Sequence, residues 1–224
     1  IVALTNLEAL RTIELKTYDW RLARTADPST ARKDIVLVEI DEYSLRNLQQ
    51  HAGRWPWPRV VHASLIDYLN RGKPKLIVYD VLFADEDLRT GFPYAGETWS
   101  GQESDKALAD TIQKAGNVIL LADATFVGDT TDRQVPPDPG YRINVPGVLE
   151  RRVIFPPAGP LSDAAAALGH NFLSLDSDGP LRHVVPFVRT GDNAMPSLGL
   201  SAALHASDID ASKVRIEGES LIAG

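Results

Sequence analysis

Three short runs of mainly aliphatic residues, each leading into an aspartate, constrain the fold of this chain more than any other feature of its sequence. They are DIVLVEI (34–40) before Asp41, KLIVYD (75–80) and NVILLAD (117–123). Short apolar runs without alternation are typical of strands that are buried on both faces. The apolar spacing between the runs predicts helices over residues 41–50, 59–72 and 104–115. Strands that alternate with helices in this way indicate a parallel sheet with crossover helices.

The second half of the sequence adds antiparallel strands. HNFLSLD (170–176) and LRHVVPFVRT (181–190) flank an Asp-Gly turn, which is a strong hairpin signal. A second hairpin is expected in VRIEGESLIAG (214–224). Two helices are expected at 162–168 and 197–206, and two irregular insertions at 84–102 and 128–147. The predicted fold class is therefore α/β, a mixed sheet with parallel strands crossed over by helices in the first half and antiparallel hairpins in the second.

A chain of 224 residues can bury one substantial core. We expect a single domain over residues 1–224. Residues 1–24 contain a helix with a partial apolar stripe, and residues 34–224 form the α/β core.

Composition excludes several classes of function. The net charge of −7 repels phosphate backbones, so nucleic acid is not an expected partner. The chain has no cysteine, which excludes disulfides, thiolate metal sites and cysteine nucleophiles. No apolar run approaches the ~20 residues of a membrane helix, and residues 1–25 lack the pattern of a signal peptide, so this chain is expected to be soluble.

The segment GRWPWPR (53–59) sets two prolines and two tryptophans between Arg54 and Arg59. Each proline holds the backbone of the preceding tryptophan extended, so the segment is a stiff, extended connection to the helix that begins near Arg59. The simplest role for Trp55 or Trp57 is to close the edge of the core. A cation in the first turn of a helix is disfavoured by the helix dipole, so Arg59 needs a compensating anion.

Asp41 and Asp80 are the carboxylates that the predicted sheet offers to Arg59. Both follow a predicted parallel strand, and the carboxyl ends of parallel strands meet at one crevice. We therefore expect Arg59 to form a bidentate pair with Asp80, or alternatively with Asp41. Asp41 is also a plausible N-cap for the helix that follows it.

The same carboxylates, together with the acidic run 85–87, raise the alternative of a divalent-metal-dependent phosphoester hydrolase. In the simpler interpretation Asp41 caps a helix, Asp80 pairs with Arg59, and residues 85–87 lie in a solvated loop. The five histidines are scattered without ligand spacing, and no serine elbow or glycine-rich phosphate loop is present. We expect no catalytic residues, no metal and no cofactor.

Asp178 and Arg182 flank the turn between the two predicted strands at 170–190. They are close enough to pair with each other, which is the simpler expectation. The alternative is that Arg182 holds a carboxylate or phosphate group of a ligand.

Several motifs in one order resemble a known family: VLVEID-x-x-SL, GRWPWPR-x-x-HA, YDVLFADED, D-x-x-LA, GHNFLSLDSDGPLRHVVP and PSLGLSAA. They span about residues 17–205 and are similar to the type-two CHASE domain, a module associated with bacterial cyclases and histidine kinases. WPWPR and DSDGPLR are the most specific of them. The proline of DSDGPLR stands where the family usually has an apolar residue, which implies a local rearrangement of that turn.

The resemblance implies an extracytoplasmic sensor that is flanked in the intact protein by membrane helices leading to a cytoplasmic output domain. The N-terminal helix would continue from a membrane span, so two copies would lie side by side as a homodimer. The resemblance does not name the small-molecule or envelope ligand. The candidate ligand-binding residues are Arg54, Arg59, Asp41, Asp80, Trp55, Trp57, Asp178 and Arg182.

Overall fold

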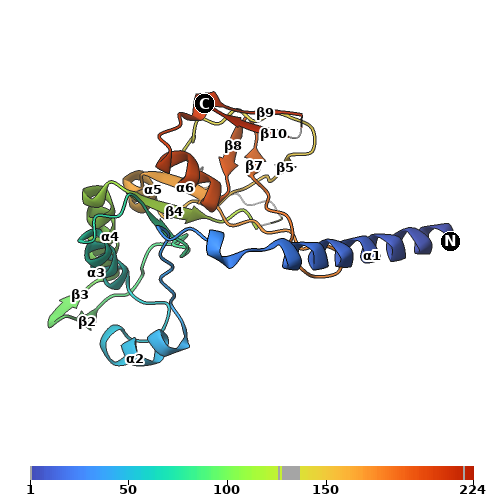
Figure 1. Ribbon diagram of the computed structural model, residues 1–224. Coiled ribbons are helices and arrows are strands. Elements are labelled where there is room, and N and C mark those ends of the chain that lie inside the picture. Colours follow the sequence, from blue (N-terminus) through green and yellow to red (C-terminus); the bar gives the residue numbers. More distant parts are fainter. Residues whose placement is uncertain (1, 126, 128–136, 219) are drawn as a thin grey trace.

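The computed structural model describes residues 2–125, 127, 137–218 and 220–224 (Figure 1). Part of the insertion expected at 128–147 therefore lies outside the described residues. The helices are α1 (Val2–Thr25), η1 (Pro28–Thr30), α2 (Glu42–Ala52), α3 (Arg59–Asn70), α4 (Gly101–Ala115), α5 (Gly159–Ala164), α6 (Leu198–Ala206) and η2 (Ala211–Lys213). The strands are β1 (Ile77–Tyr79), β2 (Phe92–Tyr94), β3 (Glu97–Trp99), β4 (Val118–Ala122), β5 (Leu149–Glu150), β6 (Ala167–His170), β7 (Phe187–Thr190), β8 (Asn193–Pro196), β9 (Val214–Glu217) and β10 (Ser220–Ala223).

The centre of the structure is a parallel sheet with the order β1-β4-β6. β4 lies between the other two strands, with Ile77 opposite Val118 and Ile119 opposite Ala167. All residues of β4 are buried, which explains why the sequence of this strand is apolar without alternation. The strands predicted at 75–80 and 117–123 are confirmed.

The helices α3 and α4 pack side by side against this sheet (Figure 1). α4 begins with a capping box in which Ser100 and Glu103 bond each other's backbone N–H groups. It ends at Gly116, which takes the left-handed conformation that favours glycine. Its inward side chains Leu108 and Ile112 join Ile66 of α3 in the main core cluster.

The second half contributes a sheet of order β5-β7-β8 and the hairpin β9-β10. β7 runs parallel to β5 and antiparallel to β8. A smaller core cluster links this region through Tyr141, Phe187, Leu204 and Val214. The mixed α/β class predicted from the sequence is confirmed, as are the helix near 197–206 and the terminal hairpin.

The strand predicted at 34–40 is absent from the structure, and that prediction is wrong. Residues 35–40 belong to no helix and pair with no strand, and α2 begins at Glu42, directly after its N-cap Asp41. The apolar pattern that is typical of a buried strand therefore lies in solvent. Only Ala52 is buried in α2.

Three smaller expectations also need correction. Residues 84–102 contain the hairpin β2-β3 and are not wholly irregular. The helix expected at 162–168 occupies Gly159–Ala164, and Leu168 belongs to β6. The Asp176–Gly179 turn forms, but a single antiparallel bridge between Leu173 and Val184 replaces the predicted paired strands beside it.

The helix α1 projects from the rest of the molecule as a long rod (Figure 1). Its side chains from residue 10 onward are mostly exposed. Among the described residues, no helix combines the length and the apolar character that a membrane span requires.

We expect the substitution Gly101→Ala to destabilise the protein, because the backbone at Asp87 crosses directly over Gly101. A Cβ atom at position 101 would lie 1.7 Å from the carbonyl oxygen of Asp87, so the chain would have to shift. Such overpacking typically costs about 1–3 kcal/mol, which thermal unfolding would detect as a lower midpoint. Gly159→Ala is the matched control, since a Cβ atom at position 159 would have no neighbour within 4 Å. Equal midpoints for the two variants would contradict the prediction.

Candidate functional site

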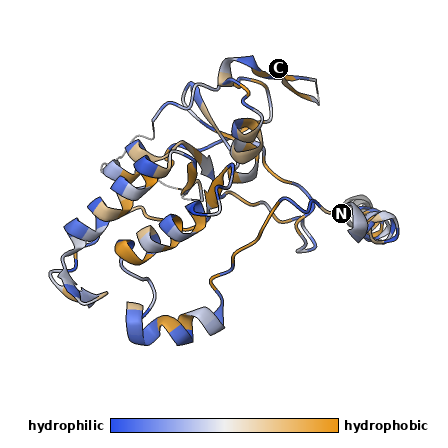
Figure 2. Cartoon of the chain, turned by 60° about the vertical axis from the view of Figure 1, so that its left-hand side comes forward, coloured by the Kyte–Doolittle hydropathy of each residue, from blue (hydrophilic) through white to orange (hydrophobic). Residues whose placement is uncertain are grey.

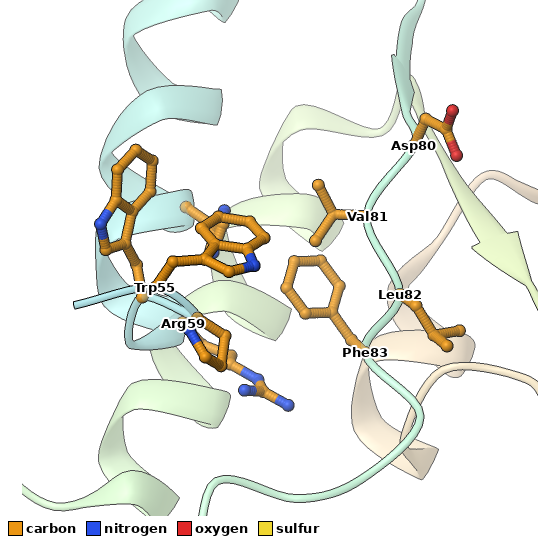
Figure 3. A pocket seen from close by; sticks show the side chains of 9 residues that line it. Trp55, Arg59, Asp80, Val81, Leu82 and Phe83 are labelled. Carbon is orange, nitrogen blue, oxygen red and sulfur yellow. The ribbon is translucent and has the colours of Figure 1, made fainter. Parts of the chain in front are cut away.

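A cavity of about 300 Å³ lies between the GRWPWPR segment and the residues that follow β1 (Figure 3). The segment and the first turns of α3 form one wall, and the chain leaving β1 forms the other. The lining residues are Trp55, Pro56, Trp57, Arg59, His62, Asp80, Val81, Leu82 and Phe83.

Four aromatic rings line this cavity in mutual contact. The rings of Trp55 and Trp57 meet edge to face with centroids 5.2 Å apart, and Trp55 also contacts His62 at 5.8 Å. His62 in turn contacts Phe83 at 5.1 Å. Trp57 is only 3% exposed, whereas 43% of Trp55 is exposed at the opening. The prediction that one tryptophan closes the edge of the core is confirmed for Trp57.

His62 of this aromatic cluster forms a buried polar pair with Tyr79. Nδ1 of His62 lies 2.8 Å from the hydroxyl of Tyr79 on β1. Burial, with a smaller contribution from the nearby Arg59, lowers the pKa of His62 to about 4. Burial also raises the pKa of Tyr79. Both groups are therefore neutral near pH 7, and the pair supplies hydrogen-bonding capacity without charge.

Arg59 pairs with neither Asp80 nor Asp41, so the predicted pairing is wrong. Its Nε lies 3.3 Å from Oδ1 of Asp105 on α4, and both side chains are largely buried. Its Nη2 donates a hydrogen bond of 2.7 Å to the carbonyl oxygen of Asp85. Figure 3 shows Arg59 and Asp80 at opposite ends of the cavity. The anion that compensates Arg59 comes from the neighbouring helix because α3 and α4 pack together.

A charged network extends from this pair to the GRWPWPR segment. Oδ2 of Asp105 accepts a hydrogen bond from the backbone N–H of Asp87. Burial raises the pKa of Asp105, and the Asp87 N–H and Arg59 partly oppose this effect. The carboxylate of Asp87 binds Arg89 at 2.6 Å, and Arg89 donates to the carbonyl oxygen of Pro56. Asp87 is buried, so the expectation of a fully solvated acidic loop at 85–87 is wrong.

The remaining carboxylates at the predicted strand ends are separated. Asp41 caps α2 by accepting hydrogen bonds from the N–H and hydroxyl of Ser44, whose hydroxyl contributes most to lowering the pKa of Asp41. Asp80 lines the cavity, whereas Arg54 and Asp41 do not. Over residues 2–125, 127, 137–218 and 220–224, no three histidine or carboxylate side chains gather as metal ligands would. This part of the chain thus offers no assembled site for the alternative of a metal-dependent hydrolase.

Arg182 is the centre of a second charged cluster, and its side chain is only 4% exposed. It binds Asp178 through two hydrogen bonds of 2.7 and 2.8 Å, which confirms the predicted pair. It also binds both oxygens of Asp19 on α1 at 2.7 Å and one oxygen of Asp176 at 3.1 Å. The hydrogen bond from Arg182 lowers the pKa of Asp19 and of Asp178. Three carboxylates thus surround one guanidinium and leave it no room for a ligand anion.

Sequence reasoning missed Asp105, Asp19 and Asp176. Asp176 belongs to the Asp-Ser-Asp-Gly turn and was visible as a second acid beside Asp178. Asp19 lies 163 positions before Arg182. Asp105 lies on α4, and the sequence does not indicate that α4 packs against α3, the helix that carries Arg59. For these two residues no local pattern in the sequence identifies the partner.

A comparison with protein-family models matches residues 1–222 of the chain to the model described as CHASE2 domain. No curated protein and no solved structure matches the chain significantly. The family match covers the cavity, the Arg182 cluster and α1 together.

We expect the protein to lose stability as the pH falls from about 6.5 towards 4. Burial lowers the pKa of both His62 and His170 to about 4, so the unfolded chain binds these protons first. Each group then removes up to about 1.4 kcal/mol of unfolding free energy per pH unit within this window. Denaturant unfolding at several pH values measures the slope.

The substitution His62→Gln should reduce this pH dependence, because glutamine does not titrate. His205→Gln is the control, since His205 is exposed. The interpretation is wrong if His62→Gln leaves the slope between pH 6.5 and 4.5 the same as in the control.

Proposed function

Because the chain belongs to the CHASE2 domain family, whose members are extracytoplasmic sensory domains, we propose that it is the sensor of a bacterial transmembrane receptor. It would lie on the periplasmic or extracellular face of the membrane. The signal would pass through flanking membrane helices to a cytoplasmic kinase or cyclase. The single observation that carries this proposal is the bidentate contact between Arg182 and Asp19, which joins α1 to the sensor core.

This contact is positioned to pass movement from the core to α1. Arg182 and Asp178 belong to the core, while α1 is otherwise an exposed rod. A bidentate guanidinium–carboxylate pair fixes both distance and orientation, more than a single hydrogen bond does. Any change in the 176–182 turn would therefore change the direction of α1.

The aromatic cavity is the place where we propose that the ligand binds. The indole N–H of Trp57 is buried and has no acceptor among the described residues, and such a group favours a bound acceptor. Trp55 is partly exposed, so its ring can stack on a ligand, and Asp80 adds a carboxylate to the lining of the cavity. The cavity contains both apolar surface and a few polar groups, as small-molecule sites usually do.

We further propose that the intact receptor is a homodimer with two copies of α1 side by side. Leu10, Ile13 and Trp20 are well exposed and, with Thr17, recur at alternating spacings of three and four residues. This spacing gives a stripe along one side of the helix, which is the pattern of a coiled-coil seam. The stripe buries no large side chain in the single chain.

We expect Asp19→Asn in the intact receptor to uncouple its output from the signal. Asparagine removes the negative charge and one of the two acceptors that Arg182 holds, while the core of the domain is untouched. The measurement is output activity of the receptor in membranes, compared between conditions that switch the wild type on and off. Asp138→Asn is the control, because Asp138 forms an ion pair with Arg142 elsewhere on the surface. Wild-type switching in the Asp19 variant would contradict the proposed route.

We expect Ile13→Cys to form disulfide-linked dimers in the intact receptor under mild oxidation. Every crosslink within this domain can be assigned to the new residue, because the chain has no cysteine of its own. The control is Glu14→Cys, since residue 14 lies about 100° around the helix from the stripe. Gel electrophoresis without reductant measures both variants. Equal crosslinking at the two positions would count against a seam through Ile13.

A further inference from the structure

The most unusual surface of this protein is the extended segment 35–38, IVLV. Its four side chains are between 53% and 81% exposed, although their sequence pattern is that of a buried strand. Figure 2 shows the segment as a bare hydrophobic stretch that leads into the amphipathic helix α2. A contiguous exposed run of this kind marks a surface that binds something.

The edge strand β1 offers a matching surface in the same chain. β1 pairs with β4 on one side, and no strand of the described residues pairs with its other side. Unpaired backbone groups on such an edge are a template for a further strand. Within β1, Val78 on one face is exposed, while Ile77 and Tyr79 on the other face are buried.

The order of elements favours the segment as the strand that belongs there. β1 leads to β4 through α4, and β4 leads to β6 through α5, each time by a crossover to a parallel neighbour. The segment leads to β1 through α2 and α3, which repeats the same pattern. α2 buries only Ala52, so it can move together with the segment.

We propose that residues 35–40 add to the free edge of β1 in their own chain as a fourth parallel strand. Aligning Asp41 with Asp80 places Val38 and Ile40 beside Ile77 and Tyr79 on the buried face. Glu39 then lies beside Val78 on the exposed face, so the polar residue of the segment faces solvent. The segment thus has two positions, detached as in this structure and paired with β1. In the paired position Asp41 lies beside Asp80, which lines the cavity.

The pairing has a direct test, because the chain contains no cysteine. The variant with Glu39→Cys and Val78→Cys should form an internal disulfide under mild oxidation, since directly opposed strand residues lie within disulfide reach. The control variant combines Glu39→Cys with Leu221→Cys, because Leu221 is exposed on β10 at the opposite end of the molecule from α2 (Figure 1). We expect the internal disulfide to form roughly tenfold faster in the first variant than in the control.

A third variant adds Val38→Asp to the Glu39→Cys and Val78→Cys pair. A carboxylate at position 38 would face the apolar side of the sheet, so it should abolish the internal disulfide. Hydrogen exchange of the unmodified protein gives an independent measurement. Successive N–H groups of a strand point to opposite edges, so the alternate amides of residues 36–40 that face β1 should exchange roughly a hundredfold more slowly than in an unstructured peptide.

Two outcomes would overturn the proposal. A disulfide that links two chains would show that the segment pairs with a second copy instead of its own β1. Crosslinking no faster than in the control, together with unprotected amides at 36–40, would show that the segment does not pair at all. The proposal does not depend on the receptor function, since all of these measurements use the domain alone.

Discussion

The complete burial of β4 is the constraint on which the rest of this structure depends. Its valine, isoleucine and leucine side chains, each worth about 1.5–3 kcal/mol when fully buried, are covered by helices and by the neighbouring strands. The parallel pairing on both sides of β4 sets where β1 and β6 end. The chain leaving β1 forms one wall of the aromatic cavity, and the chain leaving β6 leads to the turn that holds Arg182. Both sites are therefore positioned from the same strand.

The second constraint is the close approach of the 85–89 loop to the start of α4. Gly101 allows this approach, and the Arg59–Asp105 and Asp87–Arg89 pairs neutralise the charges that it buries. Breaking one partner of a buried pair typically costs about 3–5 kcal/mol, so the largely buried Arg59–Asp105 pair is not easily rearranged. Arg89 also donates a hydrogen bond to the carbonyl oxygen of Pro56, so the network holds the GRWPWPR side of the cavity in place. Trp55, on the same side, is partly exposed at the opening of the cavity.

The sequence predicted the parts of this structure that depend on neighbouring residues. The strands at 75–80 and 117–123, the Asp41 cap, the burial of Trp57 and the Asp178–Arg182 pair all follow from patterns within a few positions. The partners of Arg59 depend on how two helices pack, and sequence spacing does not contain that information. The strand predicted at 34–40 failed for a different reason: its pattern describes a buried environment, and in this structure the segment stands apart from the sheet and stays exposed.

The position of Asp19 along α1 determines how movement at the Arg182 cluster would reach the N-terminus. Asp19 lies 6 residues from the end of α1 at Thr25 and 17 residues from its start at Val2. At a rise of about 1.5 Å per residue, the two arms are about 9 Å and about 26 Å long. A rigid helix that pivots at Asp19 would turn a shift of about 1 Å near the core into about 3 Å at the far end. Because the contact is a single bidentate ion pair and not a broad apolar interface, it ties α1 to the core at one point and leaves most of the helix surface uncovered.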